Sequence, residues 1–379
     1  MDTPFVYGRL ADGIEFTNRE KETLQLSQNF QSRINTILIS PRRWGKSSLV
    51  ARAALAANRK DKNIKFCFID LFSVRTEEDF YKTLSQELIK ATASQPMEMM
   101  TNVRKFFRHF IPKITFNPEP NSELSLGLDW NDVKKQPDEI LDMPETIAKS
   151  QKIKLIICID EFQNISTFEH QLAFQKKCRA HWQKHQHVAY CLYGSKRHMM
   201  MEVFASPDMP FYKYGDLIFL EKIEMKHWIP FIIKRFNDTG KKIKPELAEL
   251  IVNHADHHPY YVQQIAQLSW LRTGKLWCDK ATIEEAVEAL MMQLSLLFQT
   301  ITDGLSNTQI NFLKAVLEGA QQISSKENLH KYNLGTSGNI NRVRQALVNK
   351  EIIDVLNSKI AFQDPMYKRW LQEYYFNTA

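Results

Sequence analysis

The sequence predicts an α/β domain built on a parallel sheet with flanking helices, followed by an all-α domain and a C-terminal winged helix. Three observations lead to this order. Short apolar runs alternate with long amphipathic stretches up to residue 222, helical patterns alone follow up to residue 301, and residues 302–379 hold three helical stretches and then two short β-prone runs. Alternation of strands and helices is typical of α/β domains. Three helices followed by a hairpin is the order of a winged helix.

The composition is that of a globular protein. Hydrophobic residues make up 44% of the chain and charged residues 25%, which excludes a largely disordered chain. The longest apolar runs, such as Leu155–Ile159, are too short to cross a bilayer, so no membrane contact is expected. No basic segment followed by an apolar one is visible near residue 1, and we therefore expect a cytoplasmic protein. The formal net charge of +7 permits an anionic partner without requiring one.

Five runs are apolar at nearly every position, which is the pattern of strands that are covered on both faces. These runs are Ile34–Ile39, Ile64–Ile69, Ile153–Ile159, Val188–Tyr193 and Leu217–Leu220. Helical patterns lie between them, at residues 47–58, 76–92 and 168–185. The alternation predicts a parallel sheet with helical crossovers, within a first domain that covers residues 1–222.

Residues 97–150 interrupt this alternation and are expected to form an insertion. Two β-prone runs in it, Lys113–Phe116 and Glu123–Trp130, flank a turn rich in proline and asparagine. Such a pattern predicts a β-hairpin.

The two remaining domains follow the last apolar run. Helical patterns at residues 225–237, 245–254, 259–273 and 281–300 predict a helical domain over residues 223–301. The winged helix is expected over residues 302–379.

The strongest local signal is a basic loop between the first predicted strand and the first predicted helix. Its residues are Ser40, Pro41, Arg42, Arg43, Trp44, Gly45, Lys46, Ser47 and Ser48. This is the setting of a phosphate-binding loop, in which backbone N–H groups at a helix N-terminus receive a phosphate. Lys46 is then expected to reach the β- and γ-phosphates, and the Ser47 hydroxyl to ligate Mg²⁺. Ser40 stands where the pattern G-x-x-x-x-G-K-[ST] has its first glycine, a residue that eases a tight turn.

A second signal ends the third predicted strand. The run Ile153–Ile159 is followed directly by Asp160 and Glu161. Carboxylates at the carboxyl end of such a strand lie beside the phosphate loop, at the usual ligand site of these sheets. Asp160 is expected to hold Mg²⁺ through water, and Glu161 to orient or deprotonate an attacking water. Together the two signals predict a nucleoside triphosphate site.

The chain resembles a known family in four segments. They are F-T-N-R-E-K-E at residues 16–22, S-P-R-R-W-G-K-S-S-L at residues 40–49, I-D-E-F-Q at residues 159–163 and H-P-Y-Y at residues 258–261. As an ordered set they resemble the archaeal-type ATPases, which also occur in bacteria. This family belongs to the STAND branch of the AAA+-like P-loop ATPases, close to the origin-recognition initiators. The resemblance extends from about Phe16 to the winged helix.

The resemblance implies three further site residues. Arg19 would lie near the adenine, although Asn18 as the cap of the following helix is an equal reading of that segment. Ser195, after the fourth strand, matches the sensor-1 position that reports on the γ-phosphate, and it is also placed to cap the next helix. Pro259 belongs to the segment by which a helical lid closes over the base, but this chain has Asp256-His257 where relatives often have glycines.

The partner of the winged helix is left open by the sequence. Asn341, Arg342 and Arg344 lie opposite the apolar stripe of the third helical stretch, and such side chains read base edges in DNA. From Ile301 to residue 379, however, nine Lys and Arg stand against only seven Asp and Glu. A surface that docks a protein therefore stays open beside a DNA reader.

Residues and resemblance together predict an ATP-binding protein and Mg²⁺-dependent ATPase that acts as a nucleotide-driven conformational switch, associated with DNA through its winged helix. The alternative is a signalling or defence-type switch whose winged helix docks protein and whose turnover is slow or absent. The Gly-Arg pair that supplies an arginine finger in relatives is missing, which favours slow turnover. ATP and ADP are the expected ligands, and a nucleotide-dependent homo-oligomer is an expected assembly.

Overall fold

The computed structural model describes residues 3–11, 13–93, 113–114, 126–127, 137–274, 276–356 and 359–377. The chain forms two compact units. One consists of residues 19–221, and the other joins residues 1–18 to residues 222–379.

A parallel five-stranded sheet is the centre of the first unit. Its strands are β1 (Thr36–Ile39), β2 (Ile64–Asp70), β5 (Lys154–Asp160), β6 (Val188–Gly194) and β7 (Asp216–Phe219), in the spatial order β2-β5-β6-β1-β7. Asp70 pairs with Asp160, and Ile39 pairs with Gly194, so the carboxyl ends of the strands meet at one edge of the sheet. All five strands coincide with apolar runs in the sequence, and the predicted fold class is confirmed.

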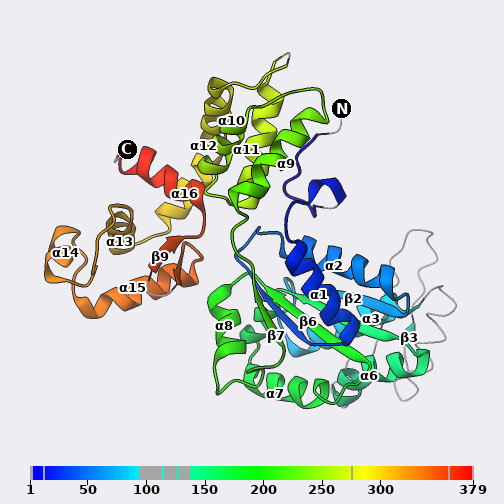
Figure 1. Cartoon of the computed structure of the whole chain (residues 1–379). Coiled ribbons are helices and arrows are strands. Elements are labelled where there is room, and N and C mark those ends of the chain that lie inside the picture. Colours follow the sequence, from blue (N-terminus) through cyan, green and yellow to red (C-terminus); the bar gives the residue numbers. More distant parts are fainter. Residues whose placement is uncertain are drawn as a thin grey trace. The chain divides into compact units, whose positions relative to one another are not determined.

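Helices cover both faces of this sheet, as Figure 1 shows. On one face lie α1 (Glu20–Ser32) and α2 (Lys46–Lys60). The other face carries α3 (Glu77–Thr92), α6 (Pro137–Gln151), α7 (Gln171–Trp182) and α8 (Arg197–Ala205), with a 3₁₀ segment, η2, at Phe162–Thr167. The core on this second face is rich in aromatic rings, among them the stacked pair Trp182 and Tyr190, whose centroids are 4.2 Å apart.

The predicted insertion extends too far along the chain. Nearly all of helix α6 (Pro137–Gln151) falls in residues 97–150, yet its Ile140, Leu141 and Ile147 are buried in the same core as the sheet. The packing of this helix against the sheet is a contact between segments far apart in the chain, which local sequence patterns do not report. Earlier in the insertion, the backbone of β3 (Lys113–Ile114) pairs antiparallel with that of β4 (Leu126–Gly127). The rest of residues 94–136 lies outside the described residues.

The second unit contains a bundle of four helices. They are α9 (Met225–Asn237), α10 (Pro245–His254), α11 (Pro259–Arg272) and α12 (Lys280–Asp303). No helix in the described part of the chain is both long and apolar enough to cross a membrane.

The N-terminal segment packs on this bundle, so the predicted boundary of 1–222 for the first domain is wrong at its start. Phe5 is 2% exposed, and its ring lies 5.7 Å from that of Phe236. The backbone N–H groups of Phe5 and Val6 donate to side-chain oxygens of Gln267 and Gln263 on α11. The segment, which also includes the 3₁₀ turn η1 (Gly13–Glu15), therefore belongs to the second unit. Local sequence patterns carry no sign of a contact between residues so far apart in the chain.

The winged helix has the predicted order of elements. It comprises α13 (Asn307–Leu317), α14 (Lys326–Lys331), α15 (Ser337–Asn349), the antiparallel pair β8 (Ile353–Leu356) and β9 (Lys359–Phe362), α16 (Pro365–Trp370) and a π-helical turn at Leu371–Tyr375. Only α16 and this turn were not foreseen.

The bundle and the winged helix share one hydrophobic core. Helix α12 runs through the predicted boundary at residues 301–302, and the buried Thr302 hydroxyl is hydrogen-bonded to the Tyr367 hydroxyl at 2.8 Å. The indole N–H of Trp370 donates to Ser295 on α12. The two predicted domains are therefore parts of one compact unit.

Phe5→Ala is expected to destabilise the second unit, because it removes a buried ring between α9 and α11. Truncation of a core phenylalanine costs about 3–5 kcal/mol. Hydrogen exchange measured by mass spectrometry should show faster exchange in α9 and α11 and unchanged exchange in α2. Phe72→Ala, at a 61% exposed position, is the matched control. Unchanged protection of α9 in Phe5→Ala would show that the N-terminal segment does not support this unit.

Candidate functional site

The phosphate loop lies where β1 ends and α2 begins. Gly45, the N-cap of α2, has φ 84°, a left-handed conformation that glycine adopts without strain. A Cβ at Gly45 would meet no atom within 4 Å, so the backbone here borders open space. The first turn of α2 therefore presents its N–H groups and the positive end of its dipole to a space that can receive an anion.

Lys46 and Ser47 face the two carboxylates that end β5. The Lys46 ammonium lies 2.9 Å from Glu161 Oε1 and 3.3 Å from Asp160 Oδ1. The Ser47 hydroxyl donates to Asp160 Oδ2 at 2.7 Å. The structure thus joins the two signals found in the sequence into one cluster. A serine hydroxyl beside a carboxylate is a pair of the hard oxygen donors that Mg²⁺ prefers.

The two neighbouring carboxyl groups are shifted in opposite directions. Burial raises the pKa of Asp160, and this effect outweighs the attraction of Lys46 and the hydrogen bond from Ser47. Burial also acts to raise the pKa of Glu161, but the Lys46 charge and the hydrogen bonds from Lys46, Gln163 and Ser195 outweigh it and lower the pKa. Glu161 is therefore held as a carboxylate, the form that accepts a proton.

Glu161 is also held by two residues on its other oxygen. The Ser195 hydroxyl donates to Glu161 Oε2 at 2.9 Å, and the Gln163 amide donates to the same atom at 2.5 Å. Glu161 itself has φ 52°, a left-handed conformation that is uncommon for a residue with a side chain. Such backbone strain persists only where the surroundings fix it, and it is frequent at functional sites.

Gln163 and Gly194 were missed in the sequence. The Gln163 side chain is fully buried, and its carbonyl oxygen occupies the space that a Cβ on Gly194 would take. That Cβ would also lie 2.8 Å from the Met200 sulfur. The signal that was available is the position of Gln163, two residues after Glu161 in I-D-E-F-Q. Gly194 could be found only from the pairing of β6 beside β1.

Ser40 does not need to be a glycine in this fold. It is buried and has a negative φ, and its hydroxyl hydrogen-bonds the Pro41 carbonyl at 3.1 Å. The left-handed positions of the loop are Arg43 and Gly45 instead. Pro41 and Trp44 are half-buried, and Ser48 is buried at the start of α2.

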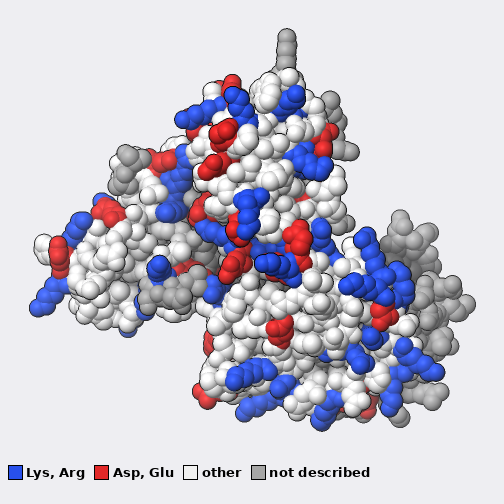
Figure 2. All heavy atoms as spheres, viewed as in Figure 1, with Lys and Arg blue, Asp and Glu red and all other residues white. Residues whose placement is uncertain are grey.

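Basic residues surround the loop. Residues 33–60 include seven Lys and Arg and no Asp or Glu, and both Arg42 and Arg43 are exposed. Figure 2 shows Lys and Arg gathered on the part of the first unit that carries α2. Clustered positive charge attracts an anionic ligand and speeds its arrival.

Arg19 is buried within the first unit and makes hydrogen bonds there. It is 4% exposed, and its guanidinium donates to the Glu221 carbonyl at 2.7 Å and to Glu22 at 3.0 Å. It occupies the N-cap position of α1 with φ 73°, so the alternative reading of Asn18 as the helix cap is wrong.

Pro259 lies in the second unit, at the first position of α11. The two residues that stand in place of glycines just before it, Asp256 and His257, both have positive φ. Asp256 forms an ion pair with Lys222 at 2.7 Å, and a ring nitrogen of His257 contacts the Ile223 carbonyl at 3.1 Å. The left-handed turn that glycines would favour is thus present without them.

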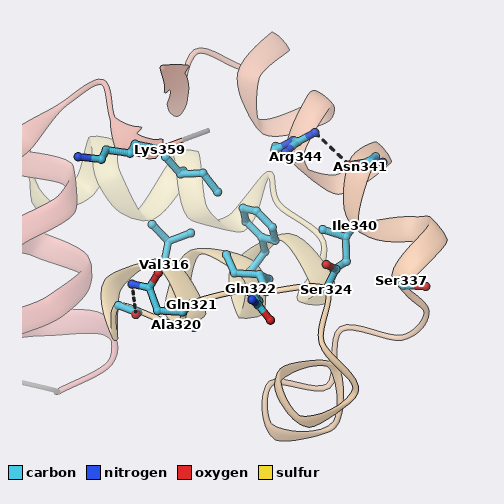
Figure 3. Close-up of a pocket in the computed structure, with 14 residues that line it drawn as sticks. Val316, Ala320, Gln321, Gln322, Ser324, Ser337, Ile340, Asn341, Arg344 and Lys359 are labelled. Atoms are coloured by element: carbon cyan, nitrogen blue, oxygen red, sulfur yellow. Dashed lines mark hydrogen bonds between the residues drawn. The ribbon is translucent and has the colours of Figure 1, made fainter. Parts of the chain in front are cut away.

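The three predicted DNA-contact residues do not share one environment. Arg342 and Asn341 are exposed on α15. Asn341 and Arg344 also line a cavity of the winged helix, where the Arg344 guanidinium donates to the Asn341 side chain at 3.0 Å (Figure 3). Arg342 is therefore the member of the set that faces solvent without lining the cavity.

Comparison with known proteins agrees with this architecture. A family described as a probable winged helix domain matches residues 296–373. The chain matches no curated protein.

Among solved structures, a Walker-type ATPase of Pyrococcus abyssi is 17% identical, with a TM-score of 0.66 over 96% of this chain and 97% of that one. The ORC2 protein of Aeropyrum pernix, in its ADPNP–ADP complexes, is 14% identical, with a TM-score of 0.58 over 97% of this chain and 96% of that one. Its ADP form is 15% identical, with a TM-score of 0.53 and the same coverage. At these identities the likeness is one of fold. It confirms the predicted resemblance at that level: a P-loop ATPase fold with a helical region and a C-terminal winged helix.

Proposed function

We propose that this protein binds ATP with Mg²⁺ and hydrolyses it slowly, as a nucleotide-driven conformational switch. The observation that carries the proposal is the cluster in which Lys46 and Ser47, at the start of α2, contact Glu161 and Asp160, at the end of β5. Nucleotide complexes of the ORC2 protein, which has a similar fold, support the same reading.

The residues present fit both ligands. Open space in front of Gly45, the positive end of α2 and the Lys46 ammonium suit a row of phosphates. The Ser47 hydroxyl and the Asp160 carboxylate suit Mg²⁺, which when bound would neutralise charge on the phosphates.

Glu161 has a different task from Asp160. Its Oε1 accepts a hydrogen bond from Lys46, while its Oε2 accepts hydrogen bonds from Ser195 and Gln163. When the phosphates of ATP recruit Lys46, Oε1 is released to accept a proton from water. Ser195 and Gln163 then keep the carboxylate in place. Ser195 would sense the γ-phosphate through its hydrogen bond to Glu161, because the position of Glu161 depends on whether Lys46 is bound to the phosphates.

Lys46→Ala and Glu161→Gln should separate binding from turnover. Lys46→Ala removes the ammonium that holds the phosphates, so ATP affinity should fall about 100-fold, the upper range for a charged hydrogen bond. Glu161→Gln cannot accept a proton, so binding should persist while hydrolysis falls by about 10²–10⁴. Binding is measured with a fluorescent ATP analogue with and without Mg²⁺, and turnover by phosphate release. Tight Mg²⁺-dependent binding in Lys46→Ala would end the assignment, and unchanged hydrolysis in Glu161→Gln would remove Glu161 from catalysis.

Gly194→Ala tests how Glu161 is held. Its methyl group would displace the Gln163 amide, and loss of a hydrogen bond to a charged group lowers turnover about tenfold. Gln163→Ala should give the same loss, with ATP affinity within about twofold of wild type in both variants.

The double variant is the control. Once Gln163 is shortened, the added methyl meets less resistance, so Gly194→Ala should reduce turnover little further. If Gly194→Ala lowers turnover by the same factor in the wild type and in Gln163→Ala, Gly194 acts on the fold alone and not through Gln163.

A second candidate function is contact with duplex DNA through α15. Its support is the match to a winged helix family together with Arg342 and Asn341, which are exposed on the third helix of that fold. This helix is the one that enters the major groove in helix-turn-helix proteins.

If the second candidate is correct, duplex DNA at low salt should stimulate ATP hydrolysis, and Arg342→Ala should abolish the stimulation. The affinity should also fall steeply as salt is added, because phosphate contacts release counterions. Lys326→Ala, at an exposed position on α14 outside α15, is the control for loss of one charge. Turnover indifferent to DNA would instead favour a winged helix that docks a protein.

A further inference from the structure

The winged helix contains a cavity of about 720 Å³. Its walls come from α13, the loop that follows α13, the first half of α15 and β9 (Figure 3). The volume lies within the range of small-molecule sites in proteins, roughly 300–1,000 Å³. It is formed by the second unit alone and involves none of the residues of the phosphate loop.

One part of the wall is apolar. The side chains that form it are Phe312, Val316, Ile323, Ile340 and Ile360. Val316, Ile323 and Ile360 are only partly buried against the core of the unit. The small winged helix therefore leaves apolar surface uncovered inside this cavity, and covering it would be favourable at about 25 cal/mol per Å².

The charge in the cavity is of one sign. Arg344 and Lys359 are its charged lining residues, and no Asp or Glu lines it. Within the described structure, neither of these two cations is ion-paired with a carboxylate. In Figure 3, Arg344 and Asn341 lie along one side of the cavity and Val316, Ala320 and Gln322 along the other, while the Lys359 side chain points away from Arg344. The cavity thus combines cationic and apolar lining residues.

Three acidic residues of the second unit have partners of their own. Glu318 accepts from the Tyr332 hydroxyl at 2.8 Å and lies 3.5 Å from the Lys331 ammonium. Glu373 pairs with Arg369 at 2.7 Å. Asp364 caps α16 and accepts from the Tyr261 hydroxyl. Within the described residues, none of these three carboxylates is paired with Arg344 or Lys359.

The start of α15 adds to the positive potential. Ser337, its first residue, lines the cavity, and in the described structure the side chain of the N-cap residue Thr336 makes no capping hydrogen bond. The positive end of this 13-residue helix is thus uncapped by a side chain on the cavity side.

From this combination we propose that the cavity is a binding site for a small organic anion with an apolar body. Arg344 binds its acidic group, the exposed Lys359 adds a second positive charge, and Val316, Ile323, Ile340 and Ile360 cover the rest. A bare phosphate would leave the apolar wall exposed to water, and an uncharged compound would leave the two cations unpaired. The site shares no lining residue with the phosphate loop, and because it includes part of α15, its occupant would act on the helix that the second candidate function places in DNA.

The probes are 8-anilinonaphthalene-1-sulfonate and its uncharged analogue N-phenyl-1-naphthylamine, titrated by fluorescence into the full-length protein without nucleotide. The sulfonate should bind more tightly than the uncharged analogue. In the variant that combines Arg344→Gln and Lys359→Gln, the affinity for the sulfonate should fall at least about tenfold, as expected for loss of charge-assisted hydrogen bonds. The affinity for the uncharged analogue should change less than about twofold, because the apolar wall is intact.

Two further variants locate the probes. Arg342→Gln removes a charge from the same helix outside the cavity and should change neither affinity. Ala320→Trp should fill the cavity and weaken both probes, with thermal unfolding used to confirm that it folds. Sulfonate affinity that is equal in wild type and the double glutamine variant would overturn the proposal. Displacement of the sulfonate by inorganic phosphate at matched ionic strength, with an affinity similar to its own, would also overturn it, since the site would then recognise the charge alone.

Discussion

A cation held between two carboxylates, at the meeting point of β5 and α2, sets the constraints on the first unit. Lys46 is largely buried, and a buried ammonium is costly unless it is paired. The pairing needs the carboxyl end of β5 to lie beside the start of α2, and the register of the parallel sheet provides this. It also needs Glu161 in a left-handed conformation, which turns the chain out of the strand at that residue. The order of the strands, the conformation of the phosphate loop and the strained backbone at Glu161 are therefore all needed to bring Lys46, Asp160 and Glu161 together.

The support of this cluster extends through β6, the strand between β5 and β1. Ser195 follows that strand and hydrogen-bonds Glu161, and Gly194 leaves the space in which the Gln163 amide lies. Gly194 also pairs with Ile39, the last residue before the phosphate loop. A substitution at Gly194 would therefore affect both the phosphate loop and the residues that hold Glu161. This is why a residue without a side chain, in a fully buried strand, can matter to the chemistry.

The local parts of this structure could be predicted from the sequence because each has a local cause. Apolar runs such as Ile153–Ile159 mark buried strands, and Lys46, Ser47, Asp160 and Glu161 follow strands whose carboxyl ends meet at one edge. Contacts between distant segments could not be predicted, because nothing in a single sequence reports them. The burial of Phe5 in the second unit and of α6 in the first belong to this class. The position of the Gln163 side chain could not be predicted either, because it depends on the lack of a side chain at Gly194 on the neighbouring strand β6.

The proposed nucleotide-driven switch must work within a chain that is divided into two compact units. The helical bundle and the winged helix share a core through α12, so a motion that reaches the bundle carries the winged helix with it. The chain passes between the units twice, after Asn18 and after Glu221. Arg19 joins these two points, because its buried guanidinium donates to the Glu221 carbonyl. Consecutive left-handed residues, Asn18 and Arg19, mark the first crossing. Within the described part of the first unit, the two ends of residues 19–221 are therefore held together by a buried side chain and not by backbone pairing.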